Sequence, residues 1–224
     1  MDLISFLTPI RMSSGDTVDN ASVKANHGAA GLDSMLDVLF STSAYMEALD
    51  DRYKFSVILK IDECDQEAID WLSTPNYEKY SSYVKYVISP REHIDAGGEV
   101  HNAPRMHYTH IHHWLHECYQ IAPKSKYYML WNHFGHMLTQ GWDKILHDYS
   151  GPVDKVISPH HPSRPGGALA PIVHHSLVQA NIDKGIKTPI AGGSPFDTWW
   201  EKAAGWVRFN EISIGVTEGC ELGK

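Results

Sequence analysis

The sequence predicts an α/β protein in which a mostly parallel sheet is covered by helices on both faces. Continuous apolar runs, typical of buried strands, alternate along the chain with segments whose apolar residues recur every three or four positions, as on one side of a helix. Strands that alternate with helices are joined as parallel βαβ units. The length of 224 residues fits one sizeable domain, and no long linker divides the chain.

The expected elements follow from these two periods. The first strand is the apolar run Leu3–Thr8, which is closed by Pro9. From Leu32 to Phe40 the apolar residues fall at positions i, i+3, i+4, i+7 and i+8, the stripe of an amphipathic helix. In all, we expect strands at 3–8, 55–61, 84–89, 126–131, 154–158 and 210–216, and helices at 32–40, 66–73 and 107–121.

Composition excludes several classes of protein. Hydrophobic residues make up 42% and charged residues 21%, close to globular averages, so a disordered or fibrous chain is excluded. A net charge of -8 argues against a nucleic-acid-binding protein, because phosphate contacts require a basic face. We expect no integral membrane segment, since no apolar run approaches about 18 residues. Three cysteines without a CxxC pair indicate free thiols in a reducing, cytoplasmic compartment.

Charged residues follow directly on the carboxyl ends of the expected strands, where open parallel sheets bind ligands. Asp62 ends the second strand and Asp65 follows it, so their oxygens would accept hydrogen bonds from a base or ribose, or help to hold a divalent cation. The alternative for Asp65 is a cap on the helix at 66–73. Arg11 and Arg91 each follow a strand and a proline, where a guanidinium can reach a diphosphate. The alternative for both is an ordinary surface arginine.

The most informative segment runs from Tyr127 to Asp143 and reads YYMLWNHFGHMLTQGWD. An apolar strand here ends in a polar cluster and is followed by a turn and a helix start. We expect Thr139 or Gln140 near the helix N-cap and Trp142 as the anchor of the turn.

Several segments of the chain together resemble glycosyltransferases of the GT-A fold, the inverting, family-2-like class that uses nucleotide-diphospho-sugars. In chain order these segments are ISFLTPIR, KIDECD, the polar turn before TQGWD, PIVHHSLVQA and SPFDTWWEKAA. The resemblance covers most of the chain. It implies a single GT-A-like (Rossmann-like) domain over residues 1–224, with a nucleotide-binding part at about 1–135 and an acceptor-side part at about 136–224.

The resemblance also implies roles for particular residues. Asp197 matches the carboxylate that deprotonates the hydroxyl of the acceptor. The acceptor would be a glycan or a small molecule, and the sugar would be transferred to it with inversion. The tryptophans that follow would stack on a sugar ring. The competing interpretation is that Asp197 lies in the first turn of a helix whose tryptophans belong to the core. Together, the resemblance and the positions after the strands give six expected residues in the site of the nucleotide-sugar donor: Pro9, Arg11, Asp62, Asp65, Arg91 and Asn132.

The chain departs from the family pattern at the metal site. The two metal-site aspartates of the family fall on His133 and Phe134, with Asn132 matching the preceding asparagine. A pyrophosphate–cation complex prefers oxygen ligands, and phenylalanine offers none. His133 and His136 would ligate Mn²⁺ or Mg²⁺ through imidazole nitrogen without adding negative charge. This departure favours an alternative in which the protein keeps the fold and binds a sugar nucleotide or glycan without catalysis.

Fifteen histidines support a second alternative, a histidine-ligated metallohydrolase. His112 and His116 form an i, i+4 pair on the helix at 107–121 and would chelate a metal on one face. The site would need His160–His161 or His174–His175 to converge with that pair. Neither an HExxH nor a CxxC pattern accompanies them, and a solvated helix face is the competing explanation.

Overall fold

The computed structural model describes residues 1–10, 12, 28–90, 107–131, 135–161, 170–180 and 204–216, with the backbone alone at 107–113 and 216. The strands are β1 (Asp2–Pro9), β2 (Phe55–Asp62), β3 (Val84–Ser89), β4 (Ser125–Leu130), β5 (Gly135–Met137), β6 (Val156–His160), β7 (Ile172–His174) and β8 (Trp206–Val216). The helices are α2 (Ala29–Ser41), α3 (Ala44–Ala48), the 3-10 helix η1 (Asp51–Tyr53), α4 (Gln66–Trp71), α5 (Pro75–Tyr80), α6 (His107–Ile121) and α7 (Trp142–His147). Residues 175–180 are also helical.

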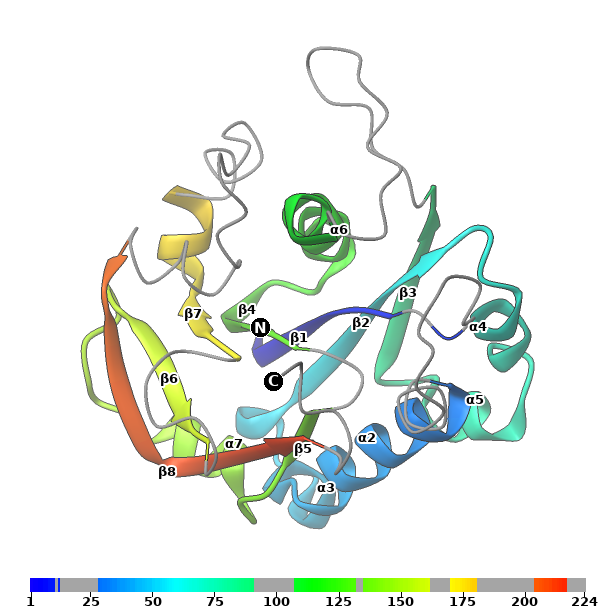
Figure 1. Ribbon diagram of the computed structural model, residues 1–224. Coiled ribbons are helices and arrows are strands. Elements are labelled where there is room, and N and C mark those ends of the chain that lie inside the picture. Colours follow the sequence, from blue (N-terminus) through cyan, green and yellow to red (C-terminus); the bar gives the residue numbers. More distant parts are fainter. Residues whose placement is uncertain are drawn as a thin grey trace.

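The strands of the described chain form one eight-stranded sheet in the order β3-β2-β1-β4-β7-β6-β8-β5 (Figure 1). Four neighbouring pairs are parallel, namely β1–β2, β1–β4, β2–β3 and β6–β8, and three are antiparallel. The α/β class and the mostly parallel sheet that the sequence predicts are confirmed.

The central strands are buried on both faces, because alternate side chains enter two different cores. On β1, Phe6 packs into the core shared with α2, whereas Leu7 packs into the core under α6. On β4, Met129 packs into the core shared with α2, and Tyr128 packs into the core under α6. Figure 1 shows α6 on one side of these strands and α2 with α3 on the other, so the prediction of helices on both faces is confirmed.

Several element boundaries differ from the predicted ones. The predicted ranges 84–89 and 107–121 coincide with β3 and α6. β6 runs through Pro159 to His160, two residues later than predicted, and its register with β8 shifts between these residues. Proline lacks the N–H of a regular ladder and is tolerated in a strand at such an irregularity. Within the described chain, no helix has both the length and the apolar character needed to cross a bilayer.

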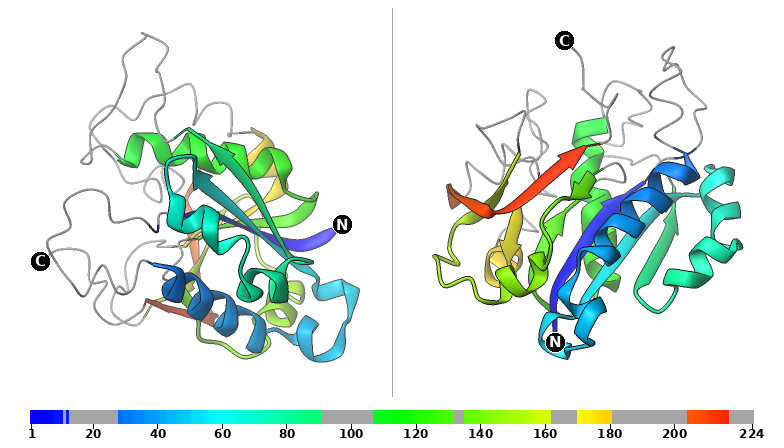
Figure 2. Two further views of the ribbon diagram at one scale, coloured as in Figure 1. Left: turned by 90° about the vertical axis from the view of Figure 1, so that its right-hand side faces the viewer. Right: turned by 90° about the horizontal axis from the view of Figure 1, so that it is seen from below.

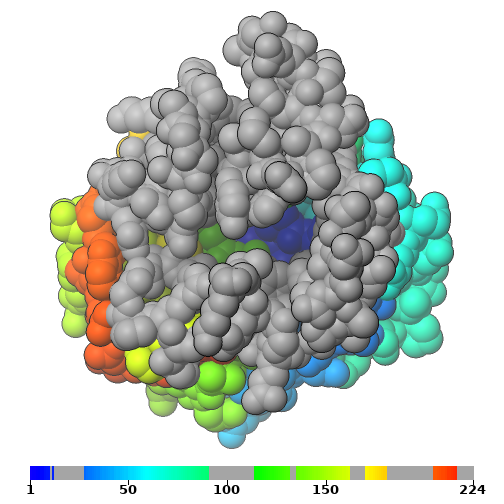
Figure 3. Space-filling view, viewed as in Figure 1, coloured from blue at the N-terminus to red at the C-terminus, as the bar shows by residue number. Residues whose placement is uncertain are grey.

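One edge of the sheet collects the carboxyl ends of β1, β2 and β4, since these strands are parallel neighbours. In the right-hand panel of Figure 2, β1 rises from the N-terminus at the bottom toward this edge. Figure 3 shows the molecule from the edge side, and blue atoms of the first residues are visible near the centre of the view.

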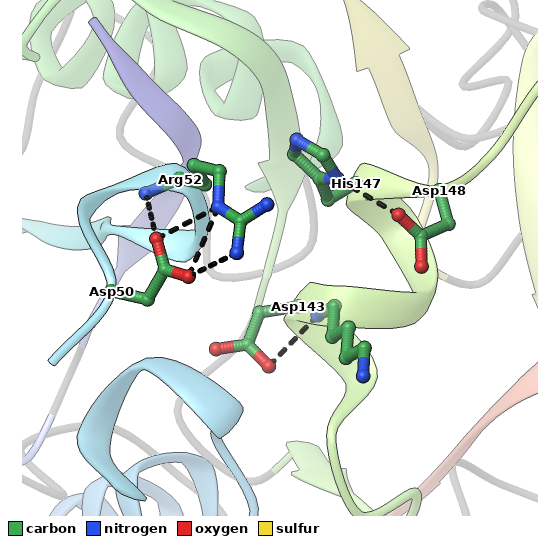
Figure 4. A network of polar contacts seen from close by, with 6 residues as sticks. Asp50, Arg52, Asp143, His147 and Asp148 are labelled. Atoms are coloured by element: carbon green, nitrogen blue, oxygen red, sulfur yellow. Dashed lines mark hydrogen bonds and ion pairs between the residues drawn. The ribbon is translucent and has the colours of Figure 1, made fainter. Parts of the chain in front are cut away.

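Asp143 of the TQGWD segment joins α7 to α3. Its buried carboxylate accepts hydrogen bonds from Ser43 Oγ at 2.6 Å and from the backbone N–H groups of Ala44 at 2.7 Å and Tyr45 at 2.8 Å. Figure 4 shows its further bond, from the N–H of Lys144 at 3.0 Å. A carboxylate that accepts from the first N–H groups of a helix satisfies donors that have no partner within the helix.

The turn before α7 differs from the sequence expectation. Gly141 is the N-cap residue, with φ 67°, a left-handed conformation that favours glycine. Its N–H donates to the carbonyl oxygen of Thr42 at 2.7 Å, which fixes the turn against the end of α2. Thr139, one of the two expected N-cap residues, instead accepts a bond from the N–H of Ser213 in β8 at 2.7 Å. Trp142 is fully buried, as expected for the anchor of the turn.

Replacing Asp143 with alanine should lower the free energy of unfolding by about 2–4 kcal/mol, because several buried donors lose their acceptor together. Urea unfolding followed by tryptophan fluorescence measures the loss. Asp148→Ala is the matched control: the side chain of Asp148 is 62% exposed and bonds only to the adjacent His147 among the described residues, so it should change stability by less than about 0.5 kcal/mol. Equal stability of the two variants would contradict the role of Asp143 in joining α7 to α3.

Candidate functional site

Asp62 lies where β2 ends at the carboxyl edge, opposite Ser89 at the end of β3. Its side chain is only 6% exposed, and Oδ1 accepts a hydrogen bond from Lys60 Nζ. No described residue donates a hydrogen bond to Oδ2. The edge therefore carries a buried carboxylate with one oxygen engaged by the protein and one without a protein donor in the described chain.

Lys60 and α6 complete the surroundings of Asp62. Lys60 Nζ lies 3.3 Å from the carbonyl oxygen of Pro90 and 5.4 Å from the ring centroid of Trp114 in α6. Glu117 of the same helix accepts a hydrogen bond from Ser89 Oγ at 2.9 Å. Sequence reasoning assigned no role to Lys60 or Trp114. The available indication was a lysine inside the otherwise apolar run FSVILKI.

Asp65 has the capping role that the sequence analysis weighed as its alternative. Oδ1 accepts from the N–H of Ala68 at 3.2 Å at the start of α4, and Oδ2 accepts from the N–H of Met12 at 2.6 Å. The N–H of Ile10 also donates to the carbonyl oxygen of Lys60 at 3.0 Å. Asp65 thus ties the chain that leaves β1 to the turn after β2. Its contact with a nucleoside stays a prediction.

The remaining donor-site predictions are only partly within the described chain. Pro9 ends β1 at the carboxyl edge and is partly buried. Trp131, which directly precedes Asn132, lies at the same edge. Its backbone N–H donates a hydrogen bond to the carbonyl oxygen of Leu7 at 3.0 Å. The predicted residues that lie outside the described residues are Arg11, Arg91, Asn132, His133 and Asp197.

Two buried polar atoms at this edge were not anticipated from the sequence. Thr8 Oγ1, near the end of β1, and Trp131 Nε1 have no hydrogen-bond partner in the described chain. Both side chains are on the α2 side of the sheet, because Trp131 packs in that core and Thr8 follows Phe6 by two residues. Single polar atoms in apolar strands leave no periodic pattern in a sequence.

His136, a predicted metal ligand, lies in β5 beside α2. Its Nε2 is 3.3 Å from Ser34 Oγ, and burial lowers the pKa of the imidazole. A lowered pKa favours the neutral ring, which is the form that binds metals. Among the described residues, no three histidine, cysteine, aspartate or glutamate side chains gather closely enough to hold a metal ion. The metal role of His136 stays a prediction.

The described histidines also bear on the metallohydrolase alternative. His160 ends β6 at the carboxyl edge, whereas His174 pairs in register with Tyr127, near the start of β4. β6 and β7 are antiparallel, so these two histidines point to opposite ends of the sheet. His116 of α6 contacts Gln120 Nε2 at 2.7 Å. The part of the chain that the structure describes therefore brings together none of the ligand sets that this alternative needs.

The α/β fold of this chain is similar to the GT-A fold of several solved glycosyltransferases. Residues 1–349 of TarS from S. aureus superpose with a TM-score of 0.57 over 96% of this chain and 60% of theirs, at 12% sequence identity. TarS 1–349 in complex with UDP-GlcNAc gives 0.54 at 12% identity, over 97% of this chain and 59% of that one. The mannosyltransferase PcManGT from Pyrobaculum calidifontis, in complex with GDP-Man and Mn²⁺, gives 0.55 at 10% identity, over 97% of this chain and 57% of that one.

These similarities confirm the predicted resemblance at the level of the fold. The chain spans about three fifths of the length of the structures it matches. No protein-family model matches the sequence, and no match to a curated protein was found.

The imidazole of His174 should titrate below its ordinary pKa of 6.5, because burial disfavours the charged ring and His175 and Lys126 add to the effect. Below pH 6.5 the unfolded chain then binds a proton here more readily than the folded one, so the free energy of unfolding should fall as the pH decreases through that range. Proton NMR titration measures the pKa.

Lys126→Met should raise the pKa of His174, because it removes a nearby positive charge. The matched control is Lys124→Met, which removes an exposed lysine two residues away and should leave the titration unchanged. A pKa for His174 at or above 6.5 in the parent protein would contradict the described environment.

Proposed function

We propose that this chain is a glycosyltransferase that moves a sugar from a nucleotide-diphospho-sugar to an acceptor hydroxyl with inversion. The observation that carries the proposal is the buried Asp62 carboxylate at the carboxyl edge of a GT-A-like sheet, with Oδ2 free of donors from the described residues. Ribose hydroxyls and base N–H groups are donors suited to that oxygen. The UDP-GlcNAc in TarS and the GDP-Man in PcManGT give the proposal further support.

The donor is proposed to lie along the carboxyl edge. Asp62 and Asp65 contact the nucleoside, and the chain around Pro9 and Asn132 lines the same site. Arg11 and Arg91 bind the diphosphate, for which guanidinium groups are suited by charge and by paired N–H donors.

The proposed chemistry is one displacement. Asp197 takes the proton of the acceptor hydroxyl, whose oxygen forms a bond to the anomeric carbon on the face opposite the nucleotide. The bond from that carbon to the diphosphate oxygen breaks at the same time, and the nucleoside diphosphate leaves with the electron pair. The acceptor is a glycan or a small molecule with a free hydroxyl.

The residues at the expected metal position do not fit a site for a hard cation. His133 and His136 offer imidazole nitrogens and Phe134 offers no ligand, whereas Mn²⁺ and Mg²⁺ on a diphosphate prefer oxygen. No step of the proposed displacement is therefore routed through a metal ion.

A second candidate function follows from the same departure. With histidine and phenylalanine at the two aspartate positions, the fold would serve to bind a sugar nucleotide or a glycan without turnover. Both candidates require nucleotide binding at the carboxyl edge, and only the first requires a general base.

Two measurements test the proposal. Calorimetry measures the binding of UDP, GDP, CDP, ADP and dTDP, and a second assay measures the release of the nucleoside diphosphate from the matching sugar donors. Asp197→Asn should lower turnover by about 10²–10⁴-fold, because general-base catalysis contributes that much, and should leave nucleotide affinity nearly unchanged. Asp154→Asn removes an exposed carboxylate and serves as the control.

Each result has a distinct meaning. Unchanged turnover in Asp197→Asn would remove Asp197 from the mechanism. Binding without turnover in the parent across the whole donor panel would favour the non-catalytic candidate. A parent that binds none of the nucleotides would contradict both candidates.

Restoring carboxylates at the metal position should create cation-dependent binding. The double variant His133→Asp with Phe134→Asp should strengthen Mn²⁺-dependent binding of the nucleoside diphosphate by about tenfold, or about 1.4 kcal/mol, since two carboxylates supply the missing charge. Calorimetry with and without Mn²⁺ measures the gain. The control replaces both residues with asparagine, which has the same size without the charge. A gain that is equal in the two double variants would exclude this turn as a cation site.

A further inference from the structure

A buried ammonium group lies beside the Asp62 carboxylate, and the proposed mechanism does not use it. The side chain of Lys60 is 1% exposed, although lysine is among the residues least often found inside a protein. Removing an ammonium from water costs several kcal/mol unless charged and hydrogen-bonding partners compensate. A lysine in the middle of a doubly buried strand therefore calls for a specific explanation.

Within the described chain, the polar partners of the Lys60 ammonium lie at the carboxyl edge. An ammonium has three N–H donors, and three oxygens are within reach of Nζ. One is Asp62 Oδ1, and the other two are the carbonyl oxygens of Ser89 at 3.5 Å and Pro90 at 3.3 Å, where β3 ends. The ring of Trp114 covers the group from α6 at 5.4 Å, an arrangement that favours a cation. The position of Nζ is thus fixed from several directions.

The fixed ammonium in turn holds the carboxylate. Lys60 and Asp62 are two residues apart on β2 and project from the same face of the sheet. The last torsion of an aspartate side chain is broad and would otherwise let the carboxylate turn. The bond from Nζ engages Oδ1 and leaves Oδ2 as the oxygen without a donor from the described residues. A ligand that binds Oδ2 then meets an acceptor that is already oriented, which reduces the entropy cost of binding.

Stability of the fold is a weak explanation for the pair. Replacing a buried ion pair with apolar residues of similar volume is often neutral or stabilising, because the desolvation of both charges is avoided. An apolar side chain at position 60 would also continue the run FSVIL that precedes it. The pair is better explained by what it does to the orientation of Asp62.

We infer that Lys60 is a positioning residue that holds the Asp62 carboxylate in the orientation that accepts hydrogen bonds from the nucleoside of the donor. This inference rests on the proposed function. It deepens that proposal by adding a residue, outside the proposed donor contacts, that orients Asp62 toward the nucleoside. Lys60 acts through Asp62 and takes no part in the displacement.

The test compares Lys60→Met, Asp62→Asn and the double variant with the parent. Calorimetry uses whichever of UDP, GDP, CDP, ADP and dTDP the parent binds best. Each single variant should weaken binding by about tenfold or more, and the double variant should be no weaker than Asp62→Asn, because both changes remove the same interaction. In the release assay, Lys60→Met should raise KM for the donor and leave kcat unchanged, a split that a general loss of structure would not produce.

Two comparisons keep the folding role separate from the positioning role. Lys85→Met removes an exposed lysine from the neighbouring strand β3 and should leave affinity and KM unchanged. Where Lys60→Met leaves Asp62 as an uncompensated buried charge and prevents folding, the double variant removes both charges and should fold. Its affinity is then compared directly with that of Asp62→Asn.

The outcomes distinguish the inference from the proposed function. A folded Lys60→Met variant that binds like the parent would overturn the inference and leave the proposed function intact. Weaker binding by the double variant than by Asp62→Asn would overturn it as well, because Lys60 would then act independently of Asp62. Failure of the parent protein to bind any of these nucleotides would contradict the proposed function itself.

Discussion

Burial of the central strands on both faces is the constraint on which the rest of the structure depends. Polar side chains on these strands are costly to bury, and several of them form hydrogen bonds with one another. At the amino edge the partners are other strand residues: Ser56 Oγ donates to Asp2 at 2.6 Å, and Ser5 Oγ lies 2.8 Å from Ser125 Oγ. At the carboxyl edge Lys60 and Asp62 pair with each other and leave one carboxylate oxygen without a described donor. Among the described residues the two edges therefore differ chemically, because Asp62 at the carboxyl edge is paired with an ammonium and Asp2 at the amino edge with a hydroxyl.

Two other carboxylates, in segments that resemble the family motifs, form hydrogen bonds that stabilise the fold. Asp143 accepts from the first N–H groups of α3, and Asp65 accepts from α4 and from the chain that leaves β1. A carboxylate that accepts several N–H hydrogen bonds is stabilised inside a protein, and this explains how both positions tolerate a buried charge. A motif residue can thus match the family pattern because of the turn it stabilises, and its match alone does not place it in contact with a substrate.

The parts of the fold that the sequence predicted are those with a strong period. β3 and α6 were placed to the residue, whereas β5 and β7 have three residues each and are too short to show any period. The end of β6 was missed because the apolar run stops before Pro159, and the strand continues through this proline only with a shift in register. At the site, Asp62 and Asp65 were singled out because Asp62 ends a strand and Asp65 follows it, and their contact with a nucleoside stays a prediction. Lys60 and Trp114 were not singled out. Packing between distant segments brings Trp114 of α6 to β2, and such packing leaves no local pattern in the sequence.

Charge balance connects the unusual features of the proposed site. In the family pattern two aspartates and a divalent cation together contribute no net charge, so replacing both aspartates by His133 and Phe134 and omitting the cation leaves that sum unchanged. The leaving diphosphate would then depend on fixed cations for stabilisation, and preoriented charges in a water-poor site are effective in this role. Lys60 is fully engaged by Asp62 and the end of β3, so its charge is already compensated. Under the proposed function, the guanidinium groups of Arg11 and Arg91 would supply positive charge to the leaving diphosphate.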